Sequence, residues 1–473
     1  MKISPASPLA WFQERAFGRI DIASLVFFRI GFGVVMLWMF QLVWSLHRIS
    51  RWWIDPPFLF KYSGFSWVQP WPGNGLYIHW ILLGVFALFL TVGFLYRISA
   101  ALFCLSHTYF FLLDQGRYVN HFYLISLLSF LLIFVPANRA FSVDAWLWPK
   151  LRSSTAPAWS LWLLRAQMGA VYFFAGVAKI APDWLHGEPL RGWFQQESAS
   201  QMLTKFLRQE WVPYAASYTS LAFDLLIVPF LFWRRTRLAA FCVAVVFHFL
   251  NAQLFPIDIF PWLAIAGTTL FLSPSWPRRV LSLFRIQTKP PKIDTVSLPS
   301  AAKRTLVLSF VTIYVAIQIL VPLRHFLYRG GIEWTYMEHR FSWQMMLERH
   351  TSRTSFYVSD PNTGQEFQIR SRQFLDLEQS THMGWRPDMV RQFAHFLAAK
   401  FVVAGPKPTE VRVRMYVSLN GRRPQLFLDP NVNLAAQPPV WGRPSWLLKV
   451  DEPLPPPGQD FSQGFFDQTR SRD

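Results

Sequence analysis

Nine long apolar stretches constrain the fold of this chain more than any other feature of its sequence. Each is close to the length of about 20 residues that a helix needs to cross a bilayer. They cover residues 24–45, 76–96, 98–114, 119–137, 161–181, 213–233, 237–255, 256–273 and 305–323. The second and third stretches, and the seventh and eighth, are joined so tightly that one member of either pair can be re-entrant. Eight spans is therefore the alternative to nine.

The composition agrees with a polytopic membrane protein that also carries a soluble part. Of 473 residues, 52% are hydrophobic and 15% are charged, with 46 Phe and 23 Trp. The formal net charge is +19. Because most basic residues lie in short loops between apolar stretches, anionic lipid is the predicted partner and nucleic acid is not.

The two cysteines and the N-terminal segment exclude some further classes. Cys104 and Cys242 both fall within predicted spans, which argues against a disulfide framework and against zinc-ligand spacing. The first 23 residues show no apolar run that ends in a cleavage site. We therefore expect the first span itself to start membrane insertion.

The basic loops predict an orientation. Arg234, Arg235 and Arg237 share one short turn, and the segment 275–304 is strongly basic. Both should be cytoplasmic. With nine spans, the N-terminus then also lies in the cytoplasm, and every strongly basic loop falls on that side. Everything after residue 324 is extracytoplasmic, and this consistency favours nine spans over eight.

The last 150 residues or so have the pattern of a small β-rich domain. Tyr357–Val358 and Phe367–Ile369 flank an Asn-Thr-Gly turn, and Val411–Ser418 and Gln425–Leu428 flank Asn-Gly. Both patterns predict hairpins. Between them, Pro387–Phe401 has apolar residues at helical spacing.

The predicted organisation is a polytopic α-helical membrane domain of eight to nine spans, followed by a small β-rich extracytoplasmic C-terminal domain. Its four segments are an interfacial N-terminal segment, the transmembrane domain, the β-rich domain and a loose proline-rich tail, at residues 1–23, 24–324, 325–450 and 451–473.

A single lysine, Lys179, stands where the fifth apolar stretch ends. One interpretation is an interfacial anchor, whose stem is buried while its charge reaches the headgroups. The other is a lysine in an apolar pocket, where loss of solvation favours the neutral amine and allows it to act as a general base. The position of this residue alone does not decide between them.

Other polar residues lie inside the predicted spans, where each is costly and usually faces the bundle interior. Asn120 and His121 open the fourth span. The other polar residues of this kind are His248, Asn251, Gln253, Arg29, Arg165 and Asp224. For the last three, the structural alternative is pairing with one another or with backbone carbonyls.

The predicted topology brings some of these groups to one face of the membrane. Lys179 ends an outward-going span, Asn120 and His121 begin an inward-going one, and Asn251 and Gln253 end another outward-going span. His248 lies about one helical turn deeper. A base, an imidazole and two amides at one depth indicate a small-molecule pocket. Metalloprotease, paired-cysteine, dinucleotide and phosphate-loop motifs are absent from the sequence, and we predict no metal.

Several motifs resemble the vitamin K-dependent γ-glutamyl carboxylases and their horizontally transferred transmembrane (HTTM) domain. The resemblance extends from about residue 20 to 445. Its motifs are AGVAK-x3-DW (Ala175–Trp184), NHFYL (Asn120–Leu124), FHxxNxQLF (Phe247–Phe255), LFLSPSWPRR (Leu270–Arg279), FSWQMM (Phe341–Met346), DPNTGQ (Asp360–Gln365) and MYVSLNGRRPQLFLDPNVN (Met415–Asn433).

The resemblance implies a catalytic mechanism. The family's catalytic base, the second lysine of AGVKK, falls on Lys179, while Ala178 replaces the first lysine. Its functional histidine falls on His121, beside Asn120. The lysine would deprotonate reduced vitamin K (the hydroquinone), which reacts with O2 to give a basic alkoxide. That base removes a γ-proton from a glutamate, CO2 adds at this carbon, and the quinone leaves as its epoxide.

The glutamate-binding segment of the family departs from its pattern in this chain. Ser-Trp and Met-Met persist within residues 339–348, but both family tyrosines, the acid and the terminal histidine are replaced. Arg340 and Trp343 are the residues left to guide a peptide, and Arg340 can equally be a solvated charge. The resemblance therefore implies quinol oxygenation more directly than protein carboxylation.

Three hypotheses follow. The first is a membrane enzyme that makes vitamin K epoxide and carboxylates glutamate in a peptide or protein, with Lys179 as base and with Asn120, His121 and His248 supporting the anion. The second keeps epoxidation and has lost carboxylation. The third is a non-enzymatic transporter or scaffold. We expect a bacterial plasma membrane, because nothing in the sequence indicates lumenal disulfides.

Overall fold

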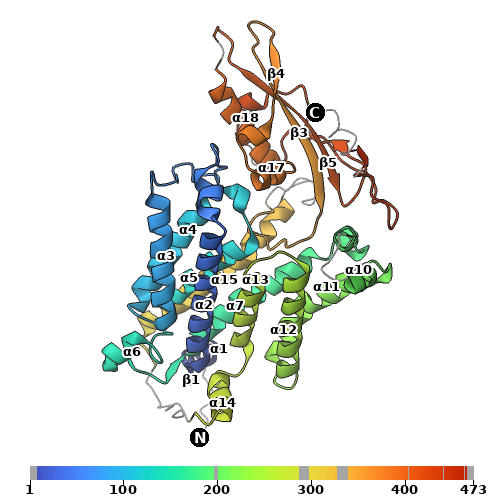
Figure 1. The fold of residues 1–473 in the computed structure, drawn as a ribbon. Coiled ribbons are helices and arrows are strands. Elements are labelled where there is room, and N and C mark those ends of the chain that lie inside the picture. The colour runs from blue at the N-terminus through green and yellow to red at the C-terminus, as the bar shows by residue number, and fades with distance from the viewer. Residues whose placement is uncertain are drawn as a thin grey trace.

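The computed structural model describes residues 8–195, 201–286, 298–327, 339–402, 404–439, 442–462 and 464–465. A bundle of helices forms one end of the molecule, and a smaller part built on a β-sheet forms the other (Figure 1). The predicted fold class, a helical membrane domain followed by a β-rich domain, is confirmed.

Seven of the described helices are long and apolar enough to cross a membrane. They are α2 (Ala23–Ser45), α3 (Gly75–Val92), α4 (Tyr96–Leu113), α7 (Ala158–Ala178), α11 (Trp211–Phe232), α12 (Arg237–Leu254) and α15 (Ala301–Leu323). Two shorter apolar segments are α5 (Asn120–Phe134) and α13 (Phe260–Thr268), which continues into the 3₁₀ turn η4 (Thr269–Phe271). Every predicted stretch is therefore helical. The count of nine membrane crossings stays a prediction, because two of the helices are short.

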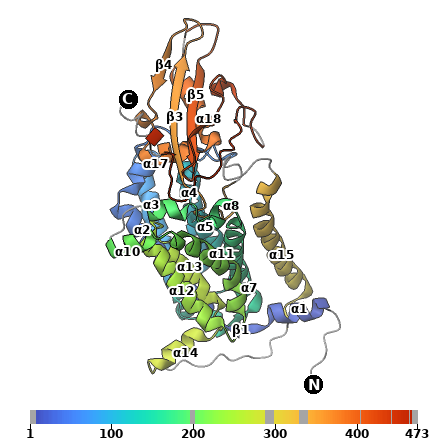
Figure 2. The ribbon, with the colours of Figure 1, turned by 90° about the vertical axis from the view of Figure 1, so that its right-hand side faces the viewer.

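Short elements complete the bundle. Towards the end that carries the N-terminus lie α1 (Pro8–Phe17), α6 (Val143–Leu147), α14 (Trp276–Leu283) and the ribbon of β1 (Arg19–Asp21) with β2 (Thr155–Pro157) (Figures 1 and 2). Elsewhere lie the π-helix η1 (Ser50–Ile54), the 3₁₀ turns η2 (Gln115–Arg117), η3 (Pro149–Leu151) and η5 (Arg324–Leu327), and the helices α8 (Pro182–Leu185), α9 (Leu190–Phe194) and α10 (Gln201–Leu207). Lys289 and Lys292 of the predicted basic loop lie outside the described residues.

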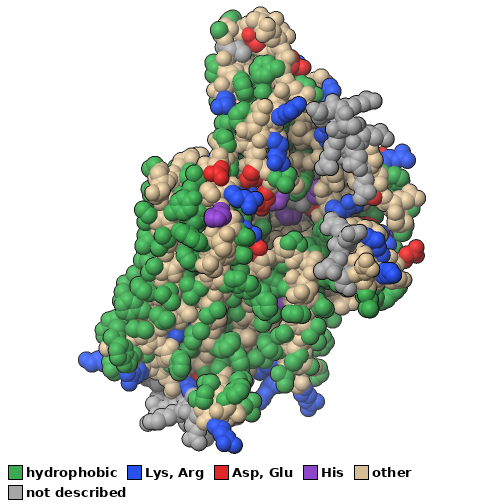
Figure 3. All heavy atoms as spheres, viewed as in Figure 1, with side chains coloured by type: hydrophobic (Ala, Val, Ile, Leu, Met, Phe, Trp, Pro, Cys, Tyr) green, Lys and Arg blue, Asp and Glu red, His purple; other side chains and the backbone are tan. Residues whose placement is uncertain are grey.

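The outer face of the bundle is apolar. Hydrophobic side chains cover much of the bundle face seen in Figure 3, and the Lys and Arg of this part lie at the end farthest from the sheet and near the junction with the C-terminal part. Ile98, Leu105 and Leu238 are among the large side chains that stay exposed. An apolar surface of this extent is expected where lipid, not water, is the solvent.

Two arginines inside the bundle have structural partners. Arg29 donates to the carbonyl oxygens of Ala137 (2.8 Å) and Phe141 (2.5 Å). Arg165 donates to Leu270 (2.7 Å) and Leu272 (3.0 Å) in the same way. These bonds satisfy carbonyls near helix ends, which supports the structural interpretation of both arginines.

The C-terminal sheet is antiparallel, with strand order β4-β3-β5-β6. The strands are β3 (His350–Ser359), β4 (Glu366–Ile369), β5 (Glu410–Leu419) and β6 (Gln425–Leu426). The helices α17 (Leu377–Met383) and α18 (Pro387–Lys400) accompany the sheet, as do the 3₁₀ turns η6 (Ser371–Gln373) and η7 (Leu434–Ala436).

The alternation of buried and exposed residues along the strands explains how the sheet packs against α18. In β5 every second residue from Val411 to Val417 is buried, and these side chains share a core with Phe356 and with Phe393 of α18. Both predicted hairpins, β3–β4 and β5–β6, are confirmed, and α18 ends one residue before its predicted end. The ten-residue pairing of β3 with β5 was not predicted, because no short turn joins these strands.

Buried polar contacts hold the two parts together. The Arg422 guanidinium donates to both carboxylate oxygens of Asp183 (2.6 and 2.8 Å), and the Asn420 amide donates to one of them (2.7 Å). On another side, the His382 ring donates from Nδ1 to the carbonyl of Gly116 (2.6 Å). Asp183 follows the end of α7, so the sheet directly positions the loop after Lys179.

Candidate active site

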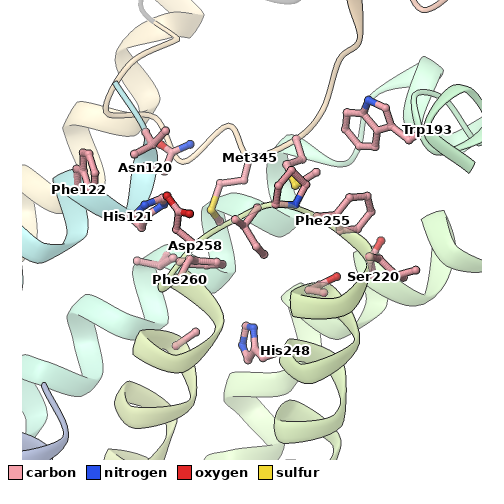
Figure 4. Close-up of a pocket in the computed structure, with 18 of the residues that line it drawn as sticks. Asn120, His121, Phe122, Trp193, Ser220, His248, Phe255, Asp258, Phe260 and Met345 are labelled. Carbon is pink, nitrogen blue, oxygen red and sulfur yellow. The ribbon is translucent and has the colours of Figure 1, made fainter. Parts of the chain in front are cut away.

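A cavity of about 780 Å³ lies where the helical bundle meets the C-terminal part. Its walls come from the start of α5, the end of α7, the helices α11, α12 and α13, and Met345 and Met346 before the sheet (Figure 4). Most of the lining side chains are apolar, with a few polar groups between them. This volume and this character are typical of a site for a small organic molecule.

Lys179 and Asp224 form an ion pair on the wall of this cavity. Lys179 Nζ lies 2.6 Å from Asp224 Oδ2, and both side chains are buried. The Trp184 ring centroid lies 5.2 Å from the same ammonium. Lys179 is therefore not a headgroup anchor, because its charge is turned inward to a carboxylate on a neighbouring helix. The alternative in which Asp224 pairs with Arg29, with Arg165 or with a backbone carbonyl does not hold, because its partner is Lys179.

A glycine allows the two helices to come close enough for this pair. A Cβ atom added to Gly176 of α7 would lie 2.7 Å from the Leu225 side chain and 3.1 Å from its backbone nitrogen. Small residues let membrane helices approach in this way. Since Leu225 follows Asp224 directly, Gly176 sets the separation at which the carboxylate reaches Lys179.

Three histidines line the cavity, His121, His248 and His339, and the first two have a buried ring nitrogen without a hydrogen-bond partner among the described residues. These nitrogens are His121 Nε2 and His248 Nδ1. His121 packs between the rings of Phe122 and Phe260 (centroids at 4.9 and 6.2 Å). A buried polar atom without a partner indicates that something absent from this structure can satisfy it, such as a ligand or a water molecule.

The two predicted amide groups differ in position. Asn251 lines the cavity, whereas Gln253 is exposed and is not among the described residues that line it. Residues two apart on a helix lie about 200° around its axis, so they do not share a face. Helical spacing from His248 favours Asn251 over Gln253, and this signal was available in the sequence.

Asn120 is engaged within the protein, although it borders the cavity. Its Oδ1 accepts a hydrogen bond from Tyr118 Oη (2.9 Å), and its Nδ2 donates to the Gln344 carbonyl (2.8 Å). The amide thus links the start of α5 to the segment that carries Met345. This geometry suits a residue that positions the cavity wall.

Arg340 and Trp343 do not appear among the described residues that line the cavity. Arg340 Nη1 donates to Asp388 Oδ2 (3.0 Å). Burial alone would raise the pKa of Asp388, but the nearby Arg340 guanidinium lowers it below its ordinary value. Trp343 is almost fully buried, with its ring 5.1 Å from that of Tyr123. Both residues therefore support the segment from within.

Several arginines line the cavity. Arg48 is paired with Asp258 (2.9 Å), and Arg117 contacts the carboxylates of Asp376 and Glu378. Arg51, on the π-helical turn η1, lines the cavity, is exposed and makes no ion pair with any described residue. Sequence reasoning did not select it, because an arginine in a loop before a Trp-Trp pair resembles an ordinary interfacial charge.

Comparison with protein-family models adds the decisive observation. A model of the HTTM domain matches residues 17–276, which is more than half of the chain. A model of the vitamin K-dependent gamma-carboxylase lumenal domain matches residues 303–453. The chain belongs to the vitamin K-dependent gamma-carboxylase family. No solved structure matched it.

The two matches coincide with the two parts of the structure. The HTTM match contains Lys179, Asp224, His121 and His248, and the gamma-carboxylase lumenal-domain match contains His339, Met345 and Met346. The cavity of this gamma-carboxylase family member is thus formed by both domains. The chain is an integral membrane protein of that family, and the lumenal-domain match indicates that its C-terminal part lies outside the cytoplasm.

Proposed function

We propose that this protein oxygenates a reduced vitamin K-type quinol to its epoxide and uses the base so formed to carboxylate glutamate in a peptide or protein. The observation that carries the proposal is the cavity, which is lined by the buried Lys179 and by His121 and His248, each with a ring nitrogen that has no partner among the described residues. The family membership supports the class of reaction. O2 and CO2 are the other reactants, and the proposed mechanism needs no metal.

The cavity residues suit such a ligand. A quinol has a flat apolar ring system with polar oxygens on opposite edges, and the mostly apolar walls of the cavity include the imidazoles of His121 and His248. When bound, a reduced vitamin K-type quinol supplies, through its reaction with O2, a base strong enough to remove a glutamate γ-proton. The protein has to bind the ring, take up the first proton and keep water away.

Lys179 takes up that proton in our proposal. A carboxylate beside the amine stabilises the ammonium that forms when the amine accepts a proton. Asp224 supplies this carboxylate, with Oδ2 at 2.6 Å from Lys179 Nζ. The observed ion pair then corresponds to the base after it has accepted a proton. His121 hydrogen-bonds an oxygen of the ligand through Nε2, while Asn120 keeps the start of α5 in place.

Recognition of a peptide substrate depends on residues other than those proposed to bind the quinol. Arg340 and Trp343 are engaged away from the cavity, which favours the alternative that epoxidation persists without carboxylation. Arg51 lines the cavity, is exposed and makes no ion pair with any described residue, so a glutamate carboxylate can pair with it, and this favours retained carboxylation.

We propose a bacterial plasma membrane as the location, with the N-terminus in the cytoplasm and with lipid around the bundle. The basic side chains at the end of the bundle opposite the sheet support this orientation (Figure 3).

The test uses purified protein in detergent with quinol, O2, labelled CO2 and a Glu-containing peptide. Epoxide and fixed label are followed together for wild type, Lys179→Ala and the control Lys205→Ala, which changes an exposed lysine of α10. We expect both products from wild type and the control, and neither from Lys179→Ala. Epoxide without label would establish the epoxidase alternative. Neither product from folded wild type would contradict the proposal.

Lys179→Arg separates the enzyme from the transporter or scaffold. Arginine keeps a positive charge beside Asp224 but does not give up its proton at any physiological pH. An enzyme that uses Lys179 as its base loses epoxide formation in this variant. A scaffold in which the ion pair only joins α7 to α11 tolerates it, so an active Lys179→Arg protein would contradict the role of Lys179 as base.

A further inference from the structure

A chain of hydrogen bonds runs from His248 into the bundle. His248 Nε2 lies 2.8 Å from Tyr172 Oη, and Tyr172 Oη lies 2.8 Å from Thr268 Oγ1. The Thr268 hydroxyl donates to the carbonyl of Ala264 (2.8 Å). All of these side chains are buried, so their hydrogen bonds do not exchange freely with water.

Only one direction of hydrogen-bond donation along this series of groups satisfies every contact. The single hydroxyl proton of Thr268 goes to the Ala264 carbonyl, so Thr268 must accept from Tyr172. The single hydroxyl proton of Tyr172 is then used, and Tyr172 must accept from His248. His248 Nε2 therefore carries a hydrogen. Tautomers are assigned from such networks, because hydrogens are not located directly.

The opposite ring nitrogen faces the cavity. His248 Nδ1 is buried and lacks a partner among the described residues, and the ring stands at the cavity wall (Figure 4). The imidazole packs against the aromatic rings of Phe223, Phe247 and Phe260. Such surroundings favour the neutral ring over an imidazolium. With Nε2 protonated, a neutral ring leaves Nδ1 with a lone pair and no hydrogen.

We infer that His248 Nδ1 accepts a hydrogen bond from a hydroxyl group of the ligand, and that it makes the cavity selective for a hydroxylated ring over the corresponding carbonyl compound. This inference rests on the proposed function for the identity of the ligand. A quinol hydroxyl can donate to Nδ1. A quinone carbonyl at the same position would place two lone pairs against each other in a buried site, with neither satisfied.

His121 cannot supply the same selectivity. His121 Nε2 has no hydrogen-bond partner among the described residues, and no contact with a described residue fixes which ring nitrogen carries the hydrogen. This nitrogen can therefore donate to a carbonyl or accept from a hydroxyl. Of His121 and His248, only His248 has its tautomer set by the hydrogen bonds of Tyr172 and Thr268. Tyr172 is therefore a positioning residue for recognition of the reduced ligand. It lies seven residues, about two helical turns, before Lys179, which directly follows α7.

The experiment compares the affinities of reduced and oxidised vitamin K, measured without oxygen by quenching of intrinsic tryptophan fluorescence in detergent. We expect wild type to bind the quinol about tenfold more tightly than the quinone, the factor of one buried hydrogen bond. His248→Gln keeps an amide that can donate to Tyr172 but lacks the acceptor at the Nδ1 position. Its preference should fall to about one.

Two further variants complete the test. His107→Gln is the matched control, because it replaces another buried histidine, bonded to Ser126 and not among the described residues that line this cavity, and it should keep the tenfold preference. Tyr172→Phe frees the tautomer of His248 and should also lower the preference. Thermal unfolding of each variant verifies that it is folded.

The outcomes are distinguishable from failure of the proposed function. Equal binding of quinol and quinone by wild type, or an unchanged preference in His248→Gln, would overturn the inference while the quinol remains the ligand. If wild type binds neither form, the proposed function fails, and the inference that rests on it falls too.

Discussion

The ion pair between Lys179 and Asp224 is the residue-scale feature on which the proposed chemistry depends. Lys179 was identifiable from the sequence, because a single charge ended an apolar stretch. Its partner was not identifiable, although Asp224 was noted as a polar residue within a span. Their contact depends on how α7 and α11 are rotated and spaced, which Gly176 and Leu225 determine by their packing. No sequence pattern in either helix encodes that relation.

Asp224→Asn should lower epoxide formation by roughly 100-fold or more, since an orienting carboxylate beside a base commonly has an effect of this size. The amide can still accept a hydrogen bond, but it no longer stabilises the ammonium. Epoxide formed per minute at saturating quinol measures the effect. Asn251→Asp serves as a comparison, because it adds a carboxylate elsewhere on the same cavity. Added to Asp224→Asn, it should not restore epoxide formation. Full activity of Asp224→Asn would contradict the role given to the pair.

At the scale of elements, the β5–β6 turn does more than reverse the chain. The Asn-Gly signal correctly predicted the hairpin, and Asn420 has the positive φ of 52° that this turn favours. The same asparagine and the nearby Arg422 bind Asp183, in the loop after α7. The sequence could predict the turn, which is local, but not this contact, which joins residues more than 200 positions apart.

Arg422→Met should destabilise the folded protein by about 2 kcal/mol or more, because it leaves the largely buried Asp183 carboxylate without its charge partner. The change should lower the apparent unfolding temperature in detergent and reduce epoxide formation. Arg412→Met is the matched control, since Arg412 pairs with Glu410 on the exposed face of β5. It should cost less than about 1 kcal/mol. Equal effects of the two variants would contradict the anchoring role of Arg422.

His382 makes the contact between the two parts sensitive to acid. Burial, and then the charge of Arg386, lower the pKa of His382 to about 4. Because an unfolded histidine titrates near 6.5, the folded state binds fewer protons between these values. Stability from the neutral ring is therefore complete above about pH 6.5 and declines as the pH falls towards 4, by at most about 3 kcal/mol.

His382→Asn tests this effect, because an asparagine amide can donate to Gly116 without titrating. Unfolding temperatures measured from pH 7.5 to 4.5 should fall less steeply in the variant than in wild type. Parallel curves for the two proteins would show that His382 does not contribute to the pH dependence.

At the scale of the whole molecule, the sequence placed helical polar groups at one end of the bundle but did not show how the irregular segment before the sheet packs there. Counting spans placed Lys179, His121 and Asn251 at one end of the bundle, and all three line the cavity. Trp343 was expected to guide a peptide, yet it is buried beside Tyr123. Side-chain direction in an irregular segment depends on the tertiary packing of that segment, which the sequence does not display.

The predicted orientation can be tested by cysteine labelling in a chain whose Cys104 and Cys242 are replaced by alanine. Gln365→Cys, exposed in the β3–β4 turn, should react with a membrane-impermeant maleimide in intact cells. Ser282→Cys, exposed in α14, should react only after lysis. The reverse pattern would contradict the assignment of the basic loops to the cytoplasm.

The shared construction of the cavity has a consequence for the biosynthesis of this protein. The helices that carry Lys179 and His248 leave the ribosome well before the segment with Met345 and Met346, which covers the cavity from the other side. A chain that is still growing therefore has the reactive amine but not the enclosure. Under the proposed function, oxygenation of the quinol in such an open site would release its strong base to water. In that mechanism, the enclosure that keeps water from the base is complete only after the last domain has folded.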